Sequence, residues 1–280
     1  MNSVSSPRLL DRGGSNRGPI LLGLASLVLA LAPPIGVLAR HDLFSAHMLQ
    51  HLLLLLVTPA FLVLSFRRSA TSRRAEFSLW PRAFKAITSP LVTWLAGIGA
   101  MWLWHAPALC AAAGSNSAMQ AVQLSSLLVC GTLFWWPVLG PVVVDRLPPL
   151  WGIAYLFSAC AACTLLGIYI TFAPTSVCPV YSHGSLSATA QCLEQNWGLT
   201  PEVDQQVGGL IMWVPGCVIY LAGALTIMAE WYASEPLPVL PGRRETQTGE
   251  RTPRTSSVQT HLNHLSGEDP HATKIPGTTA

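Results

Sequence analysis

The sequence predicts an all-α fold, a polytopic membrane helix bundle of about six transmembrane helices with both termini cytoplasmic. Only 10% of the residues are charged, whereas a soluble domain carries about 25%. Hydrophobic residues make up 51% of the chain and gather in runs of roughly 20 residues, the length that crosses a bilayer. Such runs are expected to be helical because lipid offers no partner for unpaired backbone groups. The lipid bilayer is therefore a predicted partner.

Six apolar runs are the candidate spans. They lie at about 19–39, 43–66, 90–112, 119–144, 150–172 and 207–231. The first run follows a basic segment and ends in Val37-Leu38-Ala39, so a cleaved signal peptide is the alternative to a retained first helix. Cleavage would remove one span and would move no other loop.

Basic residues give the predicted orientation, because Lys and Arg concentrate in cytoplasmic loops. The segment between the second and third runs sets one acidic residue, Glu76, against Arg67, Arg68, Arg73, Arg74, Arg82 and Lys85. Arg8, Arg12 and Arg17 place the N-terminus on the same, cytoplasmic side. The loop between the third and fourth runs and the loop 173–206 contain no Lys or Arg, so both are predicted to lie outside.

Three regions follow from this pattern: a cytoplasmic N-terminal segment at 1–18, a transmembrane helical domain at 19–232 and a cytoplasmic tail at 233–280. The tail is rich in Pro, Thr, Ser and Gly and lacks apolar periodicity, so it is predicted to be disordered. No basic tract interleaved with aromatic residues indicates nucleic-acid binding. The sequence has no glycine-rich phosphate loop, nucleophile elbow or HExxH motif, and we expect the protein not to be an enzyme.

Two histidines at the start of the second run are the strongest chemical signal. His47 and His51 are four residues apart, so on a helix they share one face and can chelate one metal ion. They would lie roughly 6 and 12 Å below the outer end of the helix, a depth at which ionisable groups suggest function. The alternative is a pair of neutral imidazoles that hydrogen-bond to neighbouring helices. His41, just above the pair, is a further candidate ligand.

Two other segments place possible ligands at the same depth. His105 lies near the outer end of the third run as a candidate third ligand, or it satisfies the carbonyl that Pro107 frees. Asp204 stands at the outer mouth of the sixth run, where it either caps the helix or joins the site. Met212 lies about two turns below Asp204; its thioether suits Cu(I), and packing is the alternative. These residues meet only if the second, third and sixth runs are neighbours.

The cysteines give weaker signals. Most of the 7 Cys sit inside apolar runs. Cys160 and Cys163 share a face of the fifth run, where thiols either bind soft metals or simply pack as small buried residues. Cys178 and Cys192 lie in the predicted outer loop. They either form a disulfide in an oxidising compartment or stay free.

Taken together, the motifs resemble those of a known family. They are His47-Met48-Leu49-Gln50-His51 with Pro59, Trp104-His105-Ala106-Pro107, Leu133-Phe134-Trp135-Trp136-Pro137-Val138-Leu139, Asp204-Gln205-Gln206, Gly208-Gly209 and Met212-Trp213-Val214-Pro215-Gly216. From about Pro19 to Trp231 the chain is similar to the CtaG family, the assembly factors of bacterial caa(3)-type cytochrome c oxidase. The resemblance implies a multi-pass protein of the bacterial inner (plasma) membrane that works with cytochrome c oxidase subunits and handles copper. Relatives tend to carry His where Met119 and Gln123 stand here.

The leading hypothesis is a non-enzymatic assembly factor that binds copper at the outer (periplasmic) face. Its ligands would be His47, His51 and His105, aided by His41, Met212 and Asp204. It would pass the ion to an oxidase subunit. One alternative is a copper permease, which predicts ligands at every depth. Another is a haem- or quinone-binding membrane redox protein, in which two of the histidines ligate haem iron.

Overall fold

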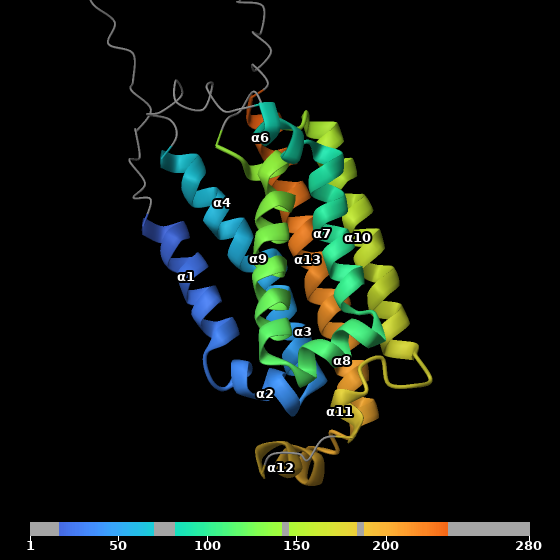
Figure 1. Ribbon diagram of the computed structural model, residues 1–280. Helices are drawn as coiled ribbons and strands as arrows, with labels where there is room; N and C mark the ends of the chain where they lie inside the picture. Colours follow the sequence, from blue (N-terminus) through green and yellow to red (C-terminus); the bar gives the residue numbers. More distant parts are fainter. Residues whose placement is uncertain (1–16, 70–81, 142–145, 184–187, 235–280) are drawn as a thin grey trace, which may run out of the picture. The chain divides into compact units, whose positions relative to one another are not determined.

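The computed structural model describes residues 17–69, 82–141, 146–183 and 188–234. All regular elements in these ranges are helical (Figure 1), which confirms the all-α prediction. The segment 1–16, the basic segment 70–81 and the tail from 235 onward lie outside the described residues, so the expectations for them stay predictions. The helices are α1 (Arg17–Leu31), α2 (Ile35–His41), α3 (Phe44–Leu52), the π-helical turn η1 (Leu53–Val57), α4 (Thr58–Ser69), α6 (Arg82–Ile87), α7 (Pro90–Trp104), α8 (Pro107–Ser115), α9 (Ser117–Leu139), α10 (Pro149–Phe172), α11 (Val180–His183), α12 (Ala188–Trp197) and α13 (Pro201–Ser234).

Four helices are long and apolar enough to cross a membrane. They are the continuous helix Phe44–Phe66 built from α3, η1 and α4, then Ser117–Leu139, Pro149–Phe172 and Pro201–Ala233. A fifth span exists if α7 and α8, which meet at an angle of 74°, form one broken span. The apolar helix α1 has only 15 residues, which corresponds to about 22 Å of the roughly 30 Å hydrocarbon core. The described residues therefore support four or five spans by length and composition.

Prolines divide two of the predicted runs. Pro33 and Pro34 separate α1 from α2 within the first run, because proline cannot donate the backbone hydrogen bond that would continue a helix. In the third run, Ala106 is extended and Pro107 begins α8 as its first residue, as expected for a residue that precedes proline. The third run is thus broken at its outer part instead of continuing straight to Ala112.

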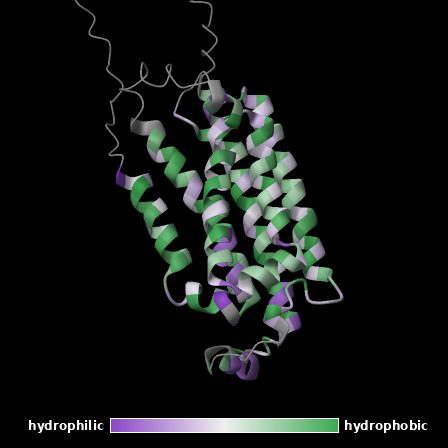
Figure 2. Ribbon diagram, viewed as in Figure 1, coloured by the Kyte–Doolittle hydropathy of each residue, from purple (hydrophilic) through white to green (hydrophobic). Residues whose placement is uncertain are grey.

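Side chains sort along the bundle as a lipid environment requires. Large apolar residues such as Phe157 and Phe172, which are 75% and 73% exposed, cover the outer helix faces. The strongest hydrophilic colouring inside the bundle gathers toward the end where α2, α3 and α8 lie (Figure 2). Apolar surface outside and polar groups inside one end are typical of a membrane protein with an internal site.

Helix α13 packs against α10 on one side and against α3 on the other. Glycines permit both contacts, as small residues do between membrane helices. A Cβ atom on Gly209 would lie 2.8 Å from the backbone nitrogen of Thr171 in α10, and one on Gly208 would lie 2.6 Å from the Phe44 ring in α3. The close approach expected at this glycine pair is therefore present on both faces of α13.

A methyl group on Gly209 should destabilise the bundle. We expect Gly209→Ala to lower stability by about 1–3 kcal/mol, because α10 or α13 must shift to avoid the Thr171 backbone. The matched control is Gly99→Ala in α7, where a Cβ would meet nothing within 4 Å. That variant should be neutral or slightly stabilising, since Ala favours helix over Gly. Thermal unfolding midpoints in detergent compare the two, and equal midpoints would contradict the packing described here.

Candidate functional site

Three imidazoles meet at the polar end of the bundle. His47 and His51 come from α3, and His105 follows the last residue of α7. The ring centroids of His47 and His51 are 4.2 Å apart, and those of His51 and His105 are 5.4 Å apart. All three side chains are buried, with exposures of 3%, 1% and 4% respectively. The structure thus brings together the three histidines that the sequence proposed as principal ligands. We call them the histidine cluster.

Most nitrogens of the histidine cluster lack a hydrogen-bond partner. Within the described residues, neither ring nitrogen of His47 nor of His51 is hydrogen-bonded. The backbone of Ala39 lies beside His47, and the side chain of Gln123 lies beside His51. A buried polar group without a partner costs about 1–3 kcal/mol. Ala39 and Gln123 are nevertheless within hydrogen-bonding reach of His47 and His51. The alternative, in which the pair bonds to neighbouring helices, therefore stays open beside metal ligation.

His105 differs because both of its ring nitrogens have close neighbours. Nδ1 lies 2.5 Å from the carbonyl oxygen of Met101, one turn earlier in α7. Nε2 lies 3.2 Å from the sulfur of Met48 on α3. The carbonyl that Pro107 would free, that of Leu103, instead accepts the N–H of Ala106. The backbone N–H of His105 bonds to Trp102 and not to Met101, so the imidazole satisfies a carbonyl that is free at the end of α7. The alternative role of His105 at the proline break is thus present, with Met101 as the partner, while Nε2 faces α3.

Asp204 holds the helix that carries the histidine pair. Its carboxylate accepts the backbone N–H groups of Phe44 at 2.5 Å and Ser45 at 3.1 Å, which are the first residues of α3. The N-cap residue Leu43 gives no side-chain bond, so Asp204 fills that role from α13, with charge of the sign that a helix N-terminus favours. The capping interpretation is thus correct in kind, but the capped helix is α3 and not α13. A role for Asp204 in metal binding stays a prediction.

Gln205 and Tyr181 arrange the segment that covers the cluster. Gln205 accepts the N–H of Val177 at 2.9 Å and donates to the carbonyl of Ile170 at 3.2 Å. This fixes the chain after α10. Tyr181 donates to the carbonyl of Ala39 at 2.6 Å, and its ring centroid is 5.5 Å from that of His47. Neither role was visible in the sequence, because both depend on contacts between distant segments.

A disulfide ties the same covering segment to α8. Cys178 bonds to Cys110, whereas Cys192 is free and exposed. The pairing of Cys178 with Cys192 is therefore wrong. The physical reason is the break at Ala106: it turns α8 by 74° away from α7. Cys110, which the sequence placed inside a straight membrane span, thereby comes beside the loop.

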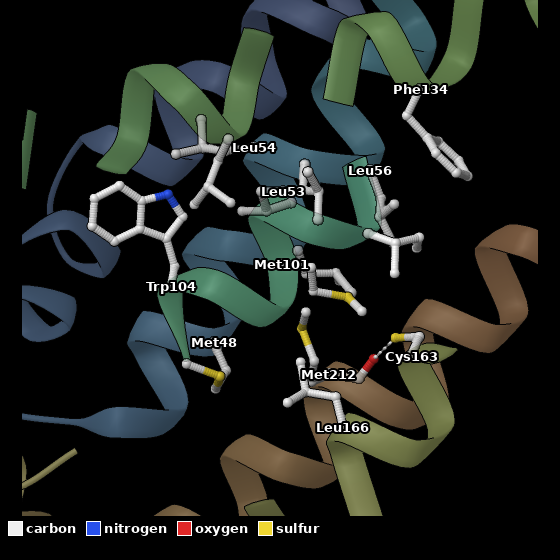
Figure 3. Close-up of a cluster of buried hydrophobic side chains, with 14 of the residues drawn as sticks. Met48, Leu53, Leu54, Leu56, Met101, Trp104, Phe134, Cys163, Leu166 and Met212 are labelled. Carbon is white, nitrogen blue, oxygen red and sulfur yellow. Dashed lines mark hydrogen bonds between the residues drawn. The ribbon is translucent and has the colours of Figure 1, made fainter. Parts of the chain in front are cut away.

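The remaining predicted ligands are less well connected to the cluster. Met212 is 1% exposed and lies with Met48 and Met101 in one buried apolar cluster (Figure 3). This placement agrees with packing, and ligation by Met212 stays a prediction. The backbone of His41 ends α2, but its side chain lies outside what the structure describes.

Two further features complete the site's surroundings. Gln123, which the sequence analysis singled out, is fully buried and lies within hydrogen-bonding reach of His51. Farther along α10 and α13, the sulfurs of Cys160 and Cys217 are 3.0 Å apart. The sequence pointed to Gln123 and Cys160, but it could not predict that Gln123 lies beside His51.

The donor set fits a metal ion, although the site is not assembled for one. Imidazoles that share an ion at about 2.0–2.1 Å per nitrogen have ring centroids within roughly 6.5 Å of each other, and the observed separations of 4.2 and 5.4 Å fall inside that limit. Nevertheless, no group of three or more His, Cys, Asp or Glu side chains in the described residues is arranged to hold a metal ion. The rings would have to rotate to converge.

These features define a polytopic α-helical membrane protein with a polar site buried at one end of its bundle. The family model of the cytochrome c oxidase caa3 assembly factors (Caa3_CtaG) matches residues 20–234, and the chain belongs to this family. The resemblance seen in the sequence motifs is thereby confirmed. A search of curated proteins and a search of solved structures each gave no match.

Removing the Asp204 carboxylate should loosen α3. We expect Asp204→Ala to cost about 2 kcal/mol or more, because a cap is lost and two buried N–H groups lose their acceptor. Asp204→Asn, which keeps one acceptor oxygen, should lose less. The control is Glu202→Gln, since Glu202 is exposed two residues earlier on the same helix. Thermal unfolding in detergent measures the order; an Asp204→Ala variant as stable as the control would contradict the capping role.

The disulfide predicts a second, separate pattern. Cys110→Ser and Cys178→Ser should each lower stability by about 2–4 kcal/mol. The double variant should be no worse than either single one, because all three remove the same bond. Cys192→Ser should behave like the unmodified protein. Thiol alkylation without reductant, followed by mass spectrometry, identifies the pairing, and a 178–192 linked peptide would refute it.

Proposed function

We propose that this member of the family is a non-enzymatic copper-handling assembly factor of the bacterial inner membrane. It takes up a copper ion at the histidine cluster on the periplasmic side and passes it to a subunit of cytochrome c oxidase. The observation that carries the proposal is the pair His47 and His51, deeply buried, with no hydrogen bond of ordinary geometry at any of their four ring nitrogens among the described residues. In an oxidase assembly factor, a copper ion carried as cargo would bind to those nitrogens.

The chemistry of the cluster supports copper binding. Neutral imidazole nitrogen is a good ligand for copper, and a bound ion would satisfy the lone pairs that are now buried without partners. The energetic cost of leaving these nitrogens unpaired in the metal-free protein is then a feature of the function, since it makes binding more favourable. A site whose rings must rotate to converge suits a carrier that releases its ion, because the closed arrangement is not locked in place.

The access route we propose begins at a recess beside the cluster. It has a volume of about 480 Å³ and is lined in part by Phe44, Tyr181, Glu202 and Gln205. The rings of Phe44 and Tyr181 both contact His47, with centroid separations of 6.4 and 5.5 Å. Two aromatic side chains therefore separate the recess from the nearest imidazole. A rotation of Tyr181 would connect them, and Glu202 would favour the approach of a cation.

We also propose the six-span topology with both termini in the cytoplasm. It counts α1 as a full span and α7 with α8 as one broken span. Under the positive-inside rule, the basic segment after α4 lies in the cytoplasm. The end of the bundle at α2 and α8 then faces the periplasm, which puts the histidine cluster and its disulfide in the oxidising compartment, where disulfides persist.

A copper permease is the second candidate function. It is favoured by the contact between Cys160 and Cys217, whose sulfurs approach to 3.0 Å away from the histidine cluster, since a permease needs soft ligands along its path. Flux of copper into sealed proteoliposomes separates a permease from a carrier. The haem- or quinone-binding alternative is tested by the absorption spectrum of the purified protein, in which a Soret band would indicate haem.

The decisive experiment measures metal bound to detergent-purified protein after copper loading and desalting. The unmodified chain should retain about one equivalent, and His47→Ala/His51→Ala should retain almost none, because two of the three imidazoles are gone. His264→Ala in the tail is the control for non-specific binding by surface histidines. Inductively coupled plasma mass spectrometry gives the copper content, and thermal unfolding establishes that each variant is folded.

The proposal fails if the unmodified chain retains no copper, or if the double variant retains as much. In the metal-free state we expect the volume-conserving variant His47→Leu/His51→Leu to be at least as stable as the original, because it removes buried polar groups without opening a cavity. A strongly destabilised metal-free variant would instead indicate that the imidazoles serve packing.

A further inference from the structure

We infer that Met48 is the fourth donor of the copper site and that the ion it takes is monovalent copper, Cu(I). This inference rests on the proposed function and specifies its cargo. It comes from the contact between His105 and Met48. The sequence motifs gave no reason to expect these two residues to meet.

The first step is the tautomer of His105. Its Nδ1 lies 2.5 Å from the carbonyl oxygen of Met101. A carbonyl oxygen only accepts hydrogen bonds, so Nδ1 carries the hydrogen and donates it. In a neutral imidazole the other nitrogen, Nε2, then has a free lone pair. The backbone of α7 thereby fixes which nitrogen of His105 is available as a ligand.

The second step is what that lone pair faces. Nε2 lies 3.2 Å from the sulfur of Met48, and a thioether sulfur has no hydrogen to donate. Two lone-pair donors thus approach each other with no hydrogen between them. A doubly protonated His105 could donate to the sulfur, but it would place a cation among buried side chains with His51 only 5.4 Å away between ring centroids, at a high cost in desolvation. An ion bound by both atoms accounts for the contact without that cost.

The third step is convergence with the histidine pair. Met48 and His51 are three residues apart on α3, so they are neighbours on the helix surface, and His105 contacts both of them. Met48 is fully buried, with 0% exposure. The Met48 side chain packs against Gly208 of α13, where an added Cβ would come within 3.0 Å of it. Its sulfur lies on the His105 side, 3.2 Å from Nε2.

The donor set selects Cu(I) on two grounds. Thioether sulfur is a soft ligand that prefers Cu(I), whereas Zn(II) and Cu(II) are satisfied by imidazole alone. Imidazole and thioether are both neutral, so the charge buried on binding is that of the ion itself, and a monovalent ion costs less to bury than a divalent one. The ion arrives and leaves as Cu(I), so the site needs no electron donor or acceptor.

The test compares three methionine variants of the full-length protein. Met48→Leu removes the proposed donor while keeping volume. Met101→Leu is the matched control, since Met101 is also 0% exposed in the same cluster and keeps the backbone carbonyl that holds His105. Met212→Leu examines the other candidate thioether. Cu(I) affinity is measured anaerobically by competition with a chromogenic Cu(I) chelator, and Zn(II) affinity is measured in parallel.

We expect Met48→Leu to weaken Cu(I) binding by about tenfold or more and to change Zn(II) binding much less. Met101→Leu should bind Cu(I) like the unmodified protein, and Met212→Leu should weaken Cu(I) binding less than Met48→Leu does. X-ray absorption at the copper edge should show a sulfur neighbour in the unmodified protein and in Met101→Leu. That neighbour should be absent in Met48→Leu.

Histidine-dependent copper binding that Met48→Leu leaves unchanged would overturn this inference while the proposed function stands. Loss on Met212→Leu instead would overturn it in favour of Met212. Copper binding that is independent of His47 and His51 would overturn the proposed function itself. If Met48→Leu fails to fold, selenomethionine-labelled unmodified protein decides the matter: a copper spectrum without a selenium neighbour excludes a thioether donor.

Discussion

The bond between Asp204 and the start of α3 is the interaction on which the site depends. A membrane helix that begins below the surface has N–H groups without partners, and water cannot supply them there. Asp204 supplies a charged acceptor from α13, and the glycine pair after it lets α13 come close enough to do so. Because His47 and His51 follow within the next two turns of α3, their position is set by this one carboxylate. Gln205, the next residue, fixes the loop after α10 in the same way. Asp204 and Gln205 therefore connect α13 to the start of α3 and to the loop that follows α10.

The break in the third span is the second constraint. A helix that continued straight to residue 112 would have kept Cys110 in line with α7 and away from Cys178. It would also have left His105 inside a regular helical turn. The proline instead ends α7 at Trp104 and sends α8 sideways. This leaves the His105 side chain free to bond back to Met101 and face α3. It also brings Cys110 to Cys178, so the covering segment with Tyr181 is attached to the same break that positions the imidazole. Access to the cluster and the geometry of the cluster thus share one structural cause.

The histidine cluster differs from an ordinary protein core in how poorly its buried polar atoms are paired. Protein interiors pair their buried polar groups almost completely. Within the described residues, however, no ring nitrogen of His47 or His51 makes a hydrogen bond of ordinary geometry, and their nearest polar groups are the backbone of Ala39 and the side chain of Gln123. Gln123 is fully buried and within hydrogen-bonding reach of His51, so its amide is placed to orient that ring.

The sequence by itself determined the helical membrane class and the family, and it named the three histidines that the structure brings together. Those conclusions follow from composition, from run length and from motifs in which neighbours in the chain remain neighbours on a helix, as His47 and His51 do. The sequence could not determine which helix Asp204 caps, which cysteine pairs with Cys178, or which atoms face Nε2 of His105. Each of these joins residues that lie between 57 and 160 positions apart, and no local pattern encodes such distances. The packing of α3 against α7 and α13 and the break between α7 and α8 decided them. In a bilayer, polar groups that a helix does not satisfy within itself must find partners on other segments.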